Sequence, residues 1–337
     1  MLRIAYVGNG KSTNRYHLPF ATKVEGIVVS KIFARSEPKW DKLEGTEYVQ
    51  DIESIWSDET LDLVVITTPP ASHFELAKEA LMRGKNVLLE KPFCETSEQA
   101  RELFRLAEEK GLFLECYQNR RYDSDFLTVQ KVIESGKLGD ILEVEMHFDY
   151  FRPEVPTNQL ELKPINDFLY SHACHTLDQV ISYFGEPNDV HYDVRQLLGP
   201  GRMNDYFDLD LFYEGALKVS VKSSFFRIKE RPSFVVYGTK GCFVKQTKDR
   251  QEEHLKLFYM PNNEDFGKDL PEHFGVLTYM DEDNQYHEEK VISEVGDYSK
   301  VYQAVYETLV NGKEQVVKPS ETIKQIELLE IGQSFLK

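Results

Sequence analysis

Val87-Leu88-Leu89-Glu90-Lys91-Pro92 has the pattern of a buried strand that ends in a charged pair and a proline. Its apolar part has the length and branched side chains of a central strand in a parallel sheet. Pro92 ends the strand, because proline has no N–H to donate to a sheet ladder. Lys91 is therefore expected at the carboxyl end of the strand, where open α/β sheets place their ligands. A lysine there can polarise a carbonyl or hydroxyl oxygen; the alternative is a solvated lysine on a surface loop.

Length and composition indicate a globular protein with two domains. The chain has 337 residues, of which 41% are hydrophobic and 12% aromatic, and this composition argues against disorder. Its formal net charge of −17 argues against nucleic acid or an anionic membrane as the main partner, since both need clustered Lys and Arg. An anionic cofactor is compatible with this charge, because a cofactor needs only a local site.

The cysteines and the N-terminus indicate a reducing compartment. The four cysteines are scattered without CxxC spacing, which fits neither a zinc site nor a disulfide framework. The chain starts at once on an apolar strand, and we see neither a signal peptide nor an apolar run long enough to span a membrane. We expect a cytoplasmic protein with a small-molecule substrate and with no nucleic-acid or membrane partner.

A glycine turn follows the first strand. Arg3–Val7 is apolar and runs into Gly8-Asn9-Gly10-Lys11-Ser12-Thr13. Strand, GxG and helix in this order are typical of a dinucleotide fold. The first glycine permits a tight turn, and the second lets the backbone approach a pyrophosphate at the helix N-terminus. Thr13 stands where a third glycine is usual, so an ordinary strand–helix turn is the alternative. Pro19 is expected to kink or interrupt the helix.

The end of the second strand, Gly26–Phe33, bears on the choice of cofactor. NAD sites normally carry an Asp or Glu there, which binds the ribose 2′-hydroxyl. This chain has Arg35 and Ser36 instead, and no acid before Glu37. A guanidinium beside a hydroxyl suits a 2′-phosphate. We therefore favour NADP over NAD; the alternative is that Arg35 faces solvent.

Strands and helices alternate over the rest of the first 120 residues. Apolar strands are also predicted at Leu61–Ile66 and Phe113–Tyr117. Capping boxes, in which a Ser or Thr precedes a Glu or Gln by three residues, are predicted to begin helices at Ser72 and Thr96. This alternation predicts a doubly wound parallel sheet, and hence a dinucleotide-binding Rossmann domain over residues 1–120.

The pattern changes to antiparallel strands after Gly139. Ile141–Tyr150 alternates apolar with polar residues, as a half-buried strand does. Thr239-Lys240-Gly241 is predicted to join two further strands as a hairpin. The later strands are expected at Asp189–Gln196, Tyr206–Tyr213, Leu217–Phe226, Phe234–Gly238 and Cys242–Lys245. The acidic region from Asp249 to Glu289 shows no clear pattern, and two helices end the chain. We expect a second domain over residues 121–337, dominated by one mostly antiparallel sheet.

Leu169–Asp178 contains a candidate acid–base residue. In an α-helix Ser171, His175 and Asp178 share one face, so His175 can meet a ligand while Asp178 orients its ring. A histidine suits proton transfer near neutral pH. One alternative is a structural interface. Another is a metal site that uses His172 and His175, although no third ligand is evident nearby.

Four motifs occur in order along the chain: Gly8-x-Gly10, Glu90-Lys91-Pro92, Tyr117-Gln118-Asn119-Arg120-Arg121 with Asp123, and His175-x-x-Asp178. Together they resemble the Gfo/Idh/MocA family, which is named for glucose–fructose oxidoreductase and inositol dehydrogenase. The resemblance covers essentially the whole chain. The stretches at residues 118–121, 151–154 and 232–241 look most like the branch that contains NADP-dependent scyllo-inositol dehydrogenase and its uncharacterised bacterial relatives.

The resemblance implies a Rossmann domain followed by an α/β domain with a large open sheet, the final helix packing back on the first domain. The resemblance also implies that the chain forms a homodimer or homotetramer through contacts of that sheet. It also implies reversible oxidation of a secondary hydroxyl on a sugar, inositol or related polyol with NAD(P). By position, Lys91 is the catalytic lysine and His175 the acid–base residue. Many members carry an Asp four residues before that histidine. This chain has Ser171 there, which bears on the substrate and on activity toward inositols.

Hydride transfer from an alcohol to C4 of a nicotinamide needs a base for the hydroxyl proton and a positive group beside the oxygen. His175 and Lys91 suit these roles, and either of them can take the proton. We expect the cofactor to be bound by Gly8, Asn9, Gly10, Lys11, Ser12, Arg35, Ser36, Thr67, Thr68, Pro69, His73, Glu90, Lys91 and Asn119, although for His73 by itself a structural or solvent role is favoured. We expect the substrate to be bound by Lys91, Asn119, Arg120, Tyr150, Arg152, Tyr170, Ser171 and His175, although Tyr150 equally suits the core.

Two other functions are compatible with the sequence. The first is a sensor of the same fold that binds a dinucleotide or sugar without catalysis; Ser171 favours it, whereas the intact Lys91 and His175 do not. The second is reduction of an imine or a conjugated tetrapyrrole on the same scaffold. The polar residues suited to hydroxyl groups favour sugars instead, and we expect no metal.

Overall fold

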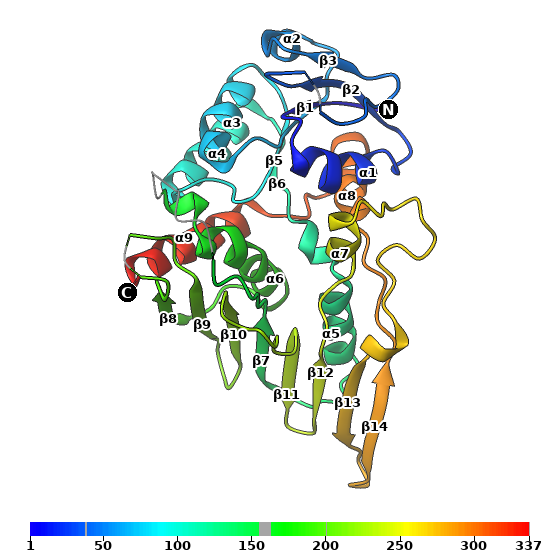
Figure 1. The fold of residues 1–337 in the computed structure, drawn as a ribbon, viewed down its shortest axis with the longest axis vertical. Coiled ribbons are helices and arrows are strands. Elements are labelled where there is room, and N and C mark those ends of the chain that lie inside the picture. The colour runs from blue at the N-terminus through cyan, green and yellow to red at the C-terminus, as the bar shows by residue number, and fades with distance from the viewer. Residues whose placement is uncertain (38, 155–162, 200, 337) are drawn as a thin grey trace. The chain divides into compact units, whose positions relative to one another are not determined.

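The computed structural model describes residues 1–37, 39–154, 163–199 and 201–336 (Figure 1). The chain forms two compact units. The N-terminal unit comprises Met1–Asn119, Leu255–Glu264 and Tyr298–Glu327. The C-terminal unit comprises Arg120–His254, Asp265–Asp297 and Leu328–Lys337. Two late segments of the chain therefore join the N-terminal unit, in addition to the residues before the boundary predicted at residue 120.

The N-terminal unit is built on a six-stranded parallel sheet in the order β3-β2-β1-β4-β5-β6 (Figure 1). The strands are β1 (Leu2–Val7), β2 (Ile27–Phe33), β3 (Glu47–Val49), β4 (Leu63–Ile66), β5 (Val87–Leu89) and β6 (Leu114–Cys116). The strand order reverses between β1 and β4, and such a switch point opens a crevice at the carboxyl ends of the strands. The predicted doubly wound sheet is confirmed, although β3, a three-residue edge strand, was not predicted.

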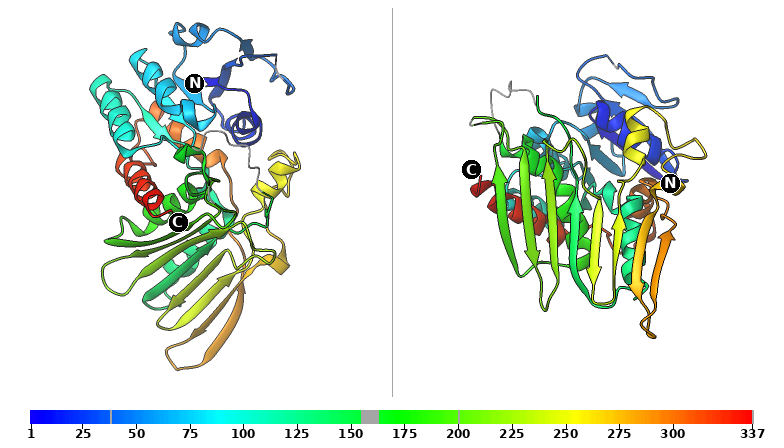
Figure 2. Two further views of the ribbon diagram at one scale, coloured as in Figure 1. Left: turned by 60° about the vertical axis from the view of Figure 1, so that its left-hand side comes forward. Right: turned by 60° about the horizontal axis from the view of Figure 1, so that its bottom comes forward.

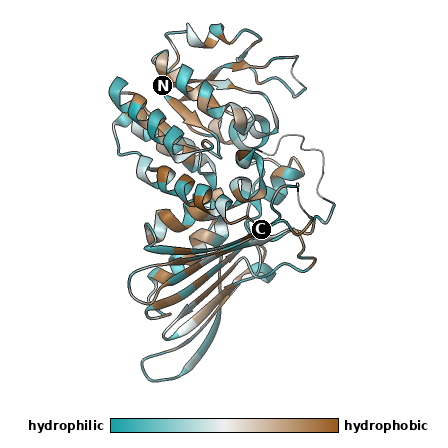
Figure 3. Ribbon diagram, turned by 90° about the vertical axis from the view of Figure 1, so that its left-hand side faces the viewer, coloured by the Kyte–Doolittle hydropathy of each residue, from teal (hydrophilic) through white to brown (hydrophobic). Residues whose placement is uncertain are grey.

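Val87, Leu88 and Leu89 form β5 between β4 and β6, and all three side chains are fully buried. A strand covered on both faces needs apolar side chains on both, which is why this run does not alternate. The helices of this unit are α1 (Leu18–Ala21), α2 (Glu53–Trp56), α3 (His73–Met82), α4 (Ser97–Lys110), α8 (Ser299–Asn311) and the greater part of α9 (Pro319–Ser334). In Figure 3 hydrophilic residues, coloured teal, alternate with hydrophobic residues, coloured brown, on the helices.

One of the two predicted capping boxes is confirmed and the other is wrong. At α4 the Oγ1 of Thr96 accepts a hydrogen bond from the Gln99 backbone N–H (3.2 Å), and the Gln99 side chain accepts one from the Thr96 N–H (3.3 Å). Ser72 makes no such bond to the start of α3. A 3₁₀ turn, Pro70–Ser72, runs directly into α3 and gives Ser72 a helical backbone (φ −103°, ψ −3°), whereas an N-cap residue needs an extended one.

The first helix changes its winding at the position of Pro19. Residues Thr13–His17 form a π-helical turn, and α1 follows with Pro19 in its first turn. Proline has no N–H to donate to the preceding π turn, whereas the N–H of Leu18 still donates to the Thr13 carbonyl. Pro19 thus marks the change from π to α winding, and the helix continues to Ala21.

The C-terminal unit contains an eight-stranded sheet in the order β14-β13-β12-β11-β7-β10-β9-β8 (Figure 2). The strands are β7 (Ile141–His147), β8 (Asp189–Arg195), β9 (Tyr206–Phe212), β10 (Lys218–Ser224), β11 (Phe234–Gly238), β12 (Gly241–Lys245), β13 (Gly275–Met280) and β14 (Tyr286–Val291). The β7–β10 pair is parallel and the other pairs are antiparallel, which confirms the predicted mostly antiparallel sheet. The sequence pattern did not reveal β13 or β14. For β14 the reason is that it is an edge strand with mostly exposed polar side chains.

Two helices cover one face of this sheet. α5 (Ser124–Glu134) packs on β11 and β12, and α6 (Cys174–Phe184) packs on β10. A π-helical turn, Leu169–Ala173, leads into α6. Shorter helical segments are Pro164–Asn166, α7 (Gln251–Lys256) and Pro271–His273, with Asn119–Tyr122 at the junction of the units. Within the described ranges no helix is long and apolar enough to cross a lipid bilayer.

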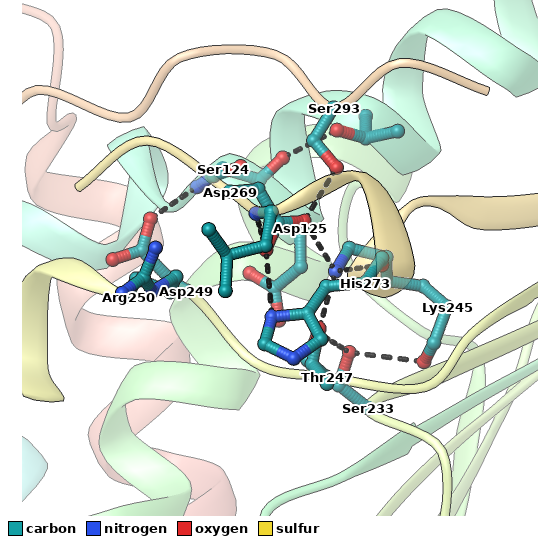
Figure 4. A network of polar contacts seen from close by, with 12 residues as sticks. Ser124, Asp125, Ser233, Lys245, Thr247, Asp249, Arg250, Asp269, His273 and Ser293 are labelled. Atoms are coloured by element: carbon teal, nitrogen blue, oxygen red, sulfur yellow. Dashed lines mark hydrogen bonds and ion pairs between the residues drawn. The ribbon is translucent and has the colours of Figure 1, made fainter. Parts of the chain in front are cut away.

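A buried lysine holds the acidic region of the C-terminal unit in place (Figure 4). Lys245, at the end of β12, has a side chain that is 1% exposed, and its Nζ lies 2.9 Å from the Asp269 carboxylate. The same ammonium donates to Thr247 Oγ1 (2.7 Å) and to the His273 carbonyl (2.9 Å). A buried charge is tolerated only when it is paired and hydrogen-bonded, so this ion pair fixes the chain between β12 and β13.

Two further acids lie in the same network (Figure 4). Burial raises the pKa of Asp125, although the Lys245 charge opposes the rise. Burial and the neighbouring Asp125 raise the pKa of Asp249 to about 7, although the N–H groups of Ser124 and Gln251 favour its ionised form. The network therefore holds more acids than cations, and Lys245 is its central positive charge.

We predict that Lys245→Met destabilises the C-terminal unit by about 3–5 kcal/mol, because it leaves the buried Asp269 carboxylate without its cation. Denaturant unfolding of the full chain, followed by circular dichroism, measures the loss. Lys131→Met is the matched control, because Lys131 pairs with Glu294 in the same unit and both side chains are more than a third exposed. The control should change stability by less than about 1 kcal/mol. Equal losses in both variants would contradict the role assigned to Lys245.

Candidate functional site

A cleft of about 660 Å³ opens in the N-terminal unit around the loops that follow β1, β2 and β4. The predicted cofactor residues that line it are Gly8, Asn9, Gly10, Lys11, Arg35, Ser36, Thr67, Thr68 and Pro69. The remaining lining residues are Phe33, Ala34, Glu37, Lys39, Trp40, Ala71 and Ser72. The cleft adjoins the switch point of the sheet, which is where dinucleotides bind in this type of fold.

The turn after β1 needs its first glycine and leaves space at its second. Gly8 has φ +123°, and a Cβ on it would lie 2.7 Å from Thr67 Oγ1. At Gly10 a Cβ would meet nothing within 4 Å, so the backbone there is open to a ligand. Thr13 replaces the usual third glycine, and its buried hydroxyl donates to the Gly8 carbonyl (3.0 Å) and pairs with Thr67 Oγ1 (2.7 Å). Through these two hydrogen bonds Thr13 connects the glycine turn to Thr67, which follows β4.

The polar groups of this turn fit an anionic ligand. The Asn9 side chain accepts a hydrogen bond from Asn14 Nδ2 (2.8 Å) through its oxygen. Its own Nδ2 is buried and has no acceptor among the residues that the structure describes. A buried donor without an acceptor is costly, and a phosphate oxygen would satisfy it. With Lys11 at the same edge of the cleft, the turn offers what a pyrophosphate needs.

Both candidate 2′-phosphate residues line the cleft. Arg35 and Ser36 follow β2, and Lys39 adds a second cation that the sequence reasoning did not include. Glu37 also lines the cleft, and its carboxylate accepts a hydrogen bond from Gln50 (3.2 Å). The charges at this end of the cleft therefore suit a dinucleotide with an additional phosphate.

Trp40 was missed by the sequence reasoning. It lines the cleft and packs against Phe258, with ring centroids 5.5 Å apart. The guanidinium of Arg15 lies 4.3 Å from the centre of the Phe258 ring. Phe258 belongs to the segment Leu255–Glu264, which joins this unit from far along the chain. The position of Trp40 shortly after Arg35 and Ser36 could have indicated that it lines the cleft. Its contact with Phe258 could not be recognised from the sequence.

Glu90 and Lys91 follow β5, as predicted, and Glu90 is tied to the glycine turn. Its carboxylate accepts hydrogen bonds from Ser12 Oγ, from His17 Nε2 (3.0 Å) and from the Lys91 backbone N–H (2.8 Å). Burial opposes ionisation of this carboxylate, but the bonds from His17 and Ser12 and the nearby Lys91 charge outweigh it and lower the pKa of Glu90 to about 2. Ser12 and Glu90 thus bind each other, and their predicted contacts with the cofactor remain predictions.

His73 is fully buried. Its Nδ1 lies 2.7 Å from the Pro92 carbonyl and its Nε2 lies 2.9 Å from the Thr68 carbonyl. Burial lowers the pKa of the His73 imidazole. These backbone contacts join the loops after β4 and β5, which is the structural role that the sequence analysis held open.

The C-terminal unit holds the candidate acid–base residue. His175 lies in the first turn of α6 and is 8% exposed. Asp178, predicted to orient its ring, has both carboxylate oxygens bound by the Arg121 guanidinium, at 2.8 Å and 2.6 Å. Ser171 lies in the π-helical turn, outside the α-helical register assumed for it, and its hydroxyl pairs with His172 Nδ1 (2.8 Å). Arg121, which the sequence analysis named only as part of a motif, is therefore a residue of this site.

The predicted substrate residues of this unit fall into two groups. Arg120 is 9% exposed, binds the carboxylates of Asp123 and Glu252, and stacks on Phe148. Tyr170 is 1% exposed and belongs to the hydrophobic core. Both residues therefore have structural contacts of their own, and their contacts with a substrate remain predictions.

The second group lies near Tyr150. The Arg152 guanidinium is 4.1 Å from the centre of the Tyr150 ring, and the His172 ring is 5.1 Å from it. Ser171 joins this group through His172. Tyr150 is only half-buried, whereas Arg152 is exposed, so these side chains can be reached from solvent in this unit.

The structure adds two observations on metals and thiols. Within the part of the chain that it describes, no group of three or more His, Cys, Asp or Glu side chains could hold a metal ion. The metal site considered for His172 and His175 thus finds no third ligand there. The four cysteines are free thiols, and three of them are buried.

Comparison with known proteins matches the two parts of the chain to two domains of one protein family. A sequence model described as the NAD-binding Rossmann fold of the Gfo/Idh/MocA oxidoreductase family matches residues 2–117. A second, described as the C-terminal alpha/beta domain of this family, matches residues 130–334. Together they account for most of the chain.

Relatives extend over the full length of the chain. The uncharacterized oxidoreductase YhhX of Escherichia coli K12 is 44% identical, over 98% of this chain and 96% of the relative. The scyllo-inositol 2-dehydrogenase (NADP(+)) IolW of Bacillus subtilis 168 is 31% identical, over 100% of this chain and 94% of the relative. A crystal structure of a probable oxidoreductase yhhX has a TM-score of 0.94 at 43% identity and covers 99% of this chain and 97% of its own.

Proposed function

The chain belongs to the Gfo/Idh/MocA oxidoreductase family, and from this premise we propose that it is an NADP-dependent dehydrogenase. In this proposal it moves a hydride between the nicotinamide and a secondary hydroxyl of a sugar, inositol or related polyol. The main observation behind the proposal is the cleft beside β1, β2 and β4. It is lined by the open glycine turn and by Arg35 and Ser36. The NADP(+)-dependent scyllo-inositol dehydrogenase among its relatives supports the same cofactor and substrate class.

The residue chemistry assigns one role to each unit. A bound nicotinamide supplies the hydride acceptor or donor. In the N-terminal unit Lys91 places a positive charge after β5, where it can stabilise the negative charge that develops on the reacting oxygen. In the C-terminal unit His175 offers an imidazole to take the hydroxyl proton during oxidation and to return it during reduction. The Arg121–Asp178 ion pair anchors the helix that carries His175.

The test of this function is nicotinamide absorbance over time. The protein is mixed with NADP or NAD and with a panel of inositols, aldoses and sugar acids. We expect reduction of NADP with one class of polyol. Lys91→Ala should lower turnover by at least about 100-fold, because it removes the charge beside the reacting oxygen, while dinucleotide binding is nearly unchanged.

Lys110→Ala is the control, because this lysine lies in the last, exposed turn of α4. It should leave turnover unchanged. Turnover in Lys91→Ala equal to that of the unchanged protein would exclude the mechanism, whatever the substrate.

Cofactor choice can be measured without any substrate. The chain has two tryptophans, Trp40 at the cleft and Trp56 in the core. Binding of NADPH should quench the emission of Trp40, and Trp40→Phe should remove this change while the emission of Trp56 remains. Arg35→Ala should weaken NADPH binding by about tenfold or more, because a charge-assisted bond to the phosphate is lost, and should leave NADH binding almost unchanged. Equal weakening for both dinucleotides would contradict the assignment of Arg35 to the 2′-phosphate.

The alternative function is a sensor that binds a dinucleotide or sugar without catalysis. The observation that favours it is Ser171, whose hydroxyl pairs with His172 where many family members have an acid. Quenching of Trp40 without reduction of NADP or NAD by any compound of a broad panel would support this reading.

We also propose a cytoplasmic homodimer or homotetramer. The free thiols suit a reducing compartment. Helices pack on one face of the large sheet, and the other face carries cross-strand ion pairs such as Lys218–Glu143 and Lys222–Asp208. A self-complementary set of charges of both signs suits a symmetric contact between two copies. Sedimentation equilibrium should give a dimer or larger assembly at micromolar concentration, and a monomer would exclude this proposal.

A further inference from the structure

The N-terminal unit contains a buried chain of hydrogen bonds that the proposed chemistry does not use. It starts at Glu90, whose carboxylate lies 3.0 Å from His17 Nε2. It continues from His17 Nδ1 to Tyr302 Oη (2.6 Å) and from Tyr302 Oη to Tyr6 Oη (2.9 Å). His17, Tyr302 and Tyr6 are fully buried and Glu90 is 7% exposed. We call these four residues the buried relay.

The direction of the hydrogen bond between His17 and Glu90 follows from the charge on Glu90. Its pKa, lowered to about 2 by the partners that outweigh its burial, makes it an ionised acceptor. The His17 Nε2 must therefore carry a proton and donate it to the carboxylate, and His17 Nδ1 pairs with the Tyr302 hydroxyl. The Tyr302 hydroxyl also pairs with the Tyr6 hydroxyl. Burial raises the pKa of both phenols, so each keeps its proton. The relay thus ends at the Glu90 carboxylate, which accepts the hydrogen bond from His17.

The relay joins four separate parts of the N-terminal unit. Tyr6 lies on β1, His17 ends the π-helical turn, Glu90 follows β5, and Tyr302 lies on α8. The His17 ring also stacks on Tyr117, with centroids 3.9 Å apart. A buried ionised group costs several kcal/mol unless its partners are held in good geometry. Hydrophobic packing alone would not require such a group, so the position of Glu90 calls for a functional reason.

Glu90 is the residue before Lys91 and is bonded to it. Glu90 Oε2 accepts a hydrogen bond from the Lys91 backbone N–H (2.8 Å). Glu90 Oε1 accepts hydrogen bonds from both His17 Nε2 and Ser12 Oγ. The orientation of the Glu90 side chain therefore fixes the backbone from which Lys91 projects. The same carboxylate places a negative charge beside the lysine, and His17 is the group that holds it there.

We propose that His17 is a positioning residue for Lys91, acting through the Glu90 carboxylate and held in turn by Tyr302 and Tyr6. The catalytic meaning of this position rests on the proposed function, whereas the positioning itself does not. The residues of the relay come from the first 17 residues, from position 90 and from position 302, so tertiary contacts assemble it.

The first test measures the reactivity of the Lys91 amine without substrate or cofactor. The full chain is treated briefly with acetic anhydride at several pH values, and mass spectrometry gives the rate of acetylation at each lysine. Two substitutions separate the two nitrogens of the ring. His17→Gln can place an amide N–H near the position of Nε2 and keep the bond to Glu90, whereas His17→Asn is too short to reach it.

We expect His17→Asn to change the acetylation rate of Lys91 by about threefold or more, because the carboxylate beside it is released. His17→Gln should restore the rate of the unchanged protein. Lys110 is the internal standard and should react equally in all variants. Unchanged Lys91 reactivity in folded His17→Asn would overturn the proposal, and so would an equal change in His17→Gln.

Tyr302→Phe provides a test that does not depend on the folding of the histidine variants. It removes the partner of Nδ1 at almost constant volume, and it should shift Lys91 reactivity in the same direction as His17→Asn. Tyr306→Phe is its control on the same helix, because the Tyr306 ring packs at Gly26 outside the relay. Equal reactivity in both tyrosine variants would also overturn the proposal.

The kinetic consequence separates this proposal from the proposed function. With a substrate in hand, His17→Asn should lower kcat by about tenfold or more at an unchanged KM for the dinucleotide, since misplacement of a reacting group acts on the chemical step. Absence of turnover in every variant, including the unchanged protein, would contradict the proposed function. The acetylation rates would still decide whether His17 positions Lys91.

Discussion

An ionised carboxylate in the interior of the N-terminal unit requires hydrogen-bond donors at fixed positions around it. Glu90 is 7% exposed, and the free energy cost of burying its charge has to be offset by donors at fixed positions. Ser12 and His17 supply two of them, so the helix after the glycine turn must lie where it does relative to β5. The cofactor turn and the candidate catalytic lysine are therefore parts of one hydrogen-bonded structure.

The C-terminal unit uses charge in the same way. With 40 Lys and Arg against 57 Asp and Glu, cations are the scarce charge in this chain. Several of them are committed to buried acids, as in the Arg121–Asp178 and Lys245–Asp269 pairs. The first pair anchors the helix of His175, and the second holds the chain between β12 and β13. Lys11, Arg35 and Lys39 gather instead around the cleft, where they make a local positive site in an acidic protein.

Local sequence signals predicted local structure where the backbone was free to follow them. Thr96 and Gln99 form their capping box because the residue before α4 has an extended backbone. The same signal failed at Ser72, because a 3₁₀ turn runs directly into α3. The strand β14 escaped prediction because an exposed edge strand has no apolar face to reveal it. The segment Leu255–Glu264 could not be assigned to the N-terminal unit, because its aromatic contact with Trp40 is made only in the folded chain.

The sequence by itself determined the parallel sheet, the glycine turn and the placement of Glu90-Lys91-Pro92 after a buried strand. Periodicity, glycine and proline act within a few residues, so they can be recognised along the chain. Tertiary structure alone decided that Asp178 binds Arg121, that Trp40 packs on Phe258, and that His17 joins Glu90 to Tyr302. Each of these contacts joins residues far apart in sequence, and a single sequence carries no signal of which distant side chains meet.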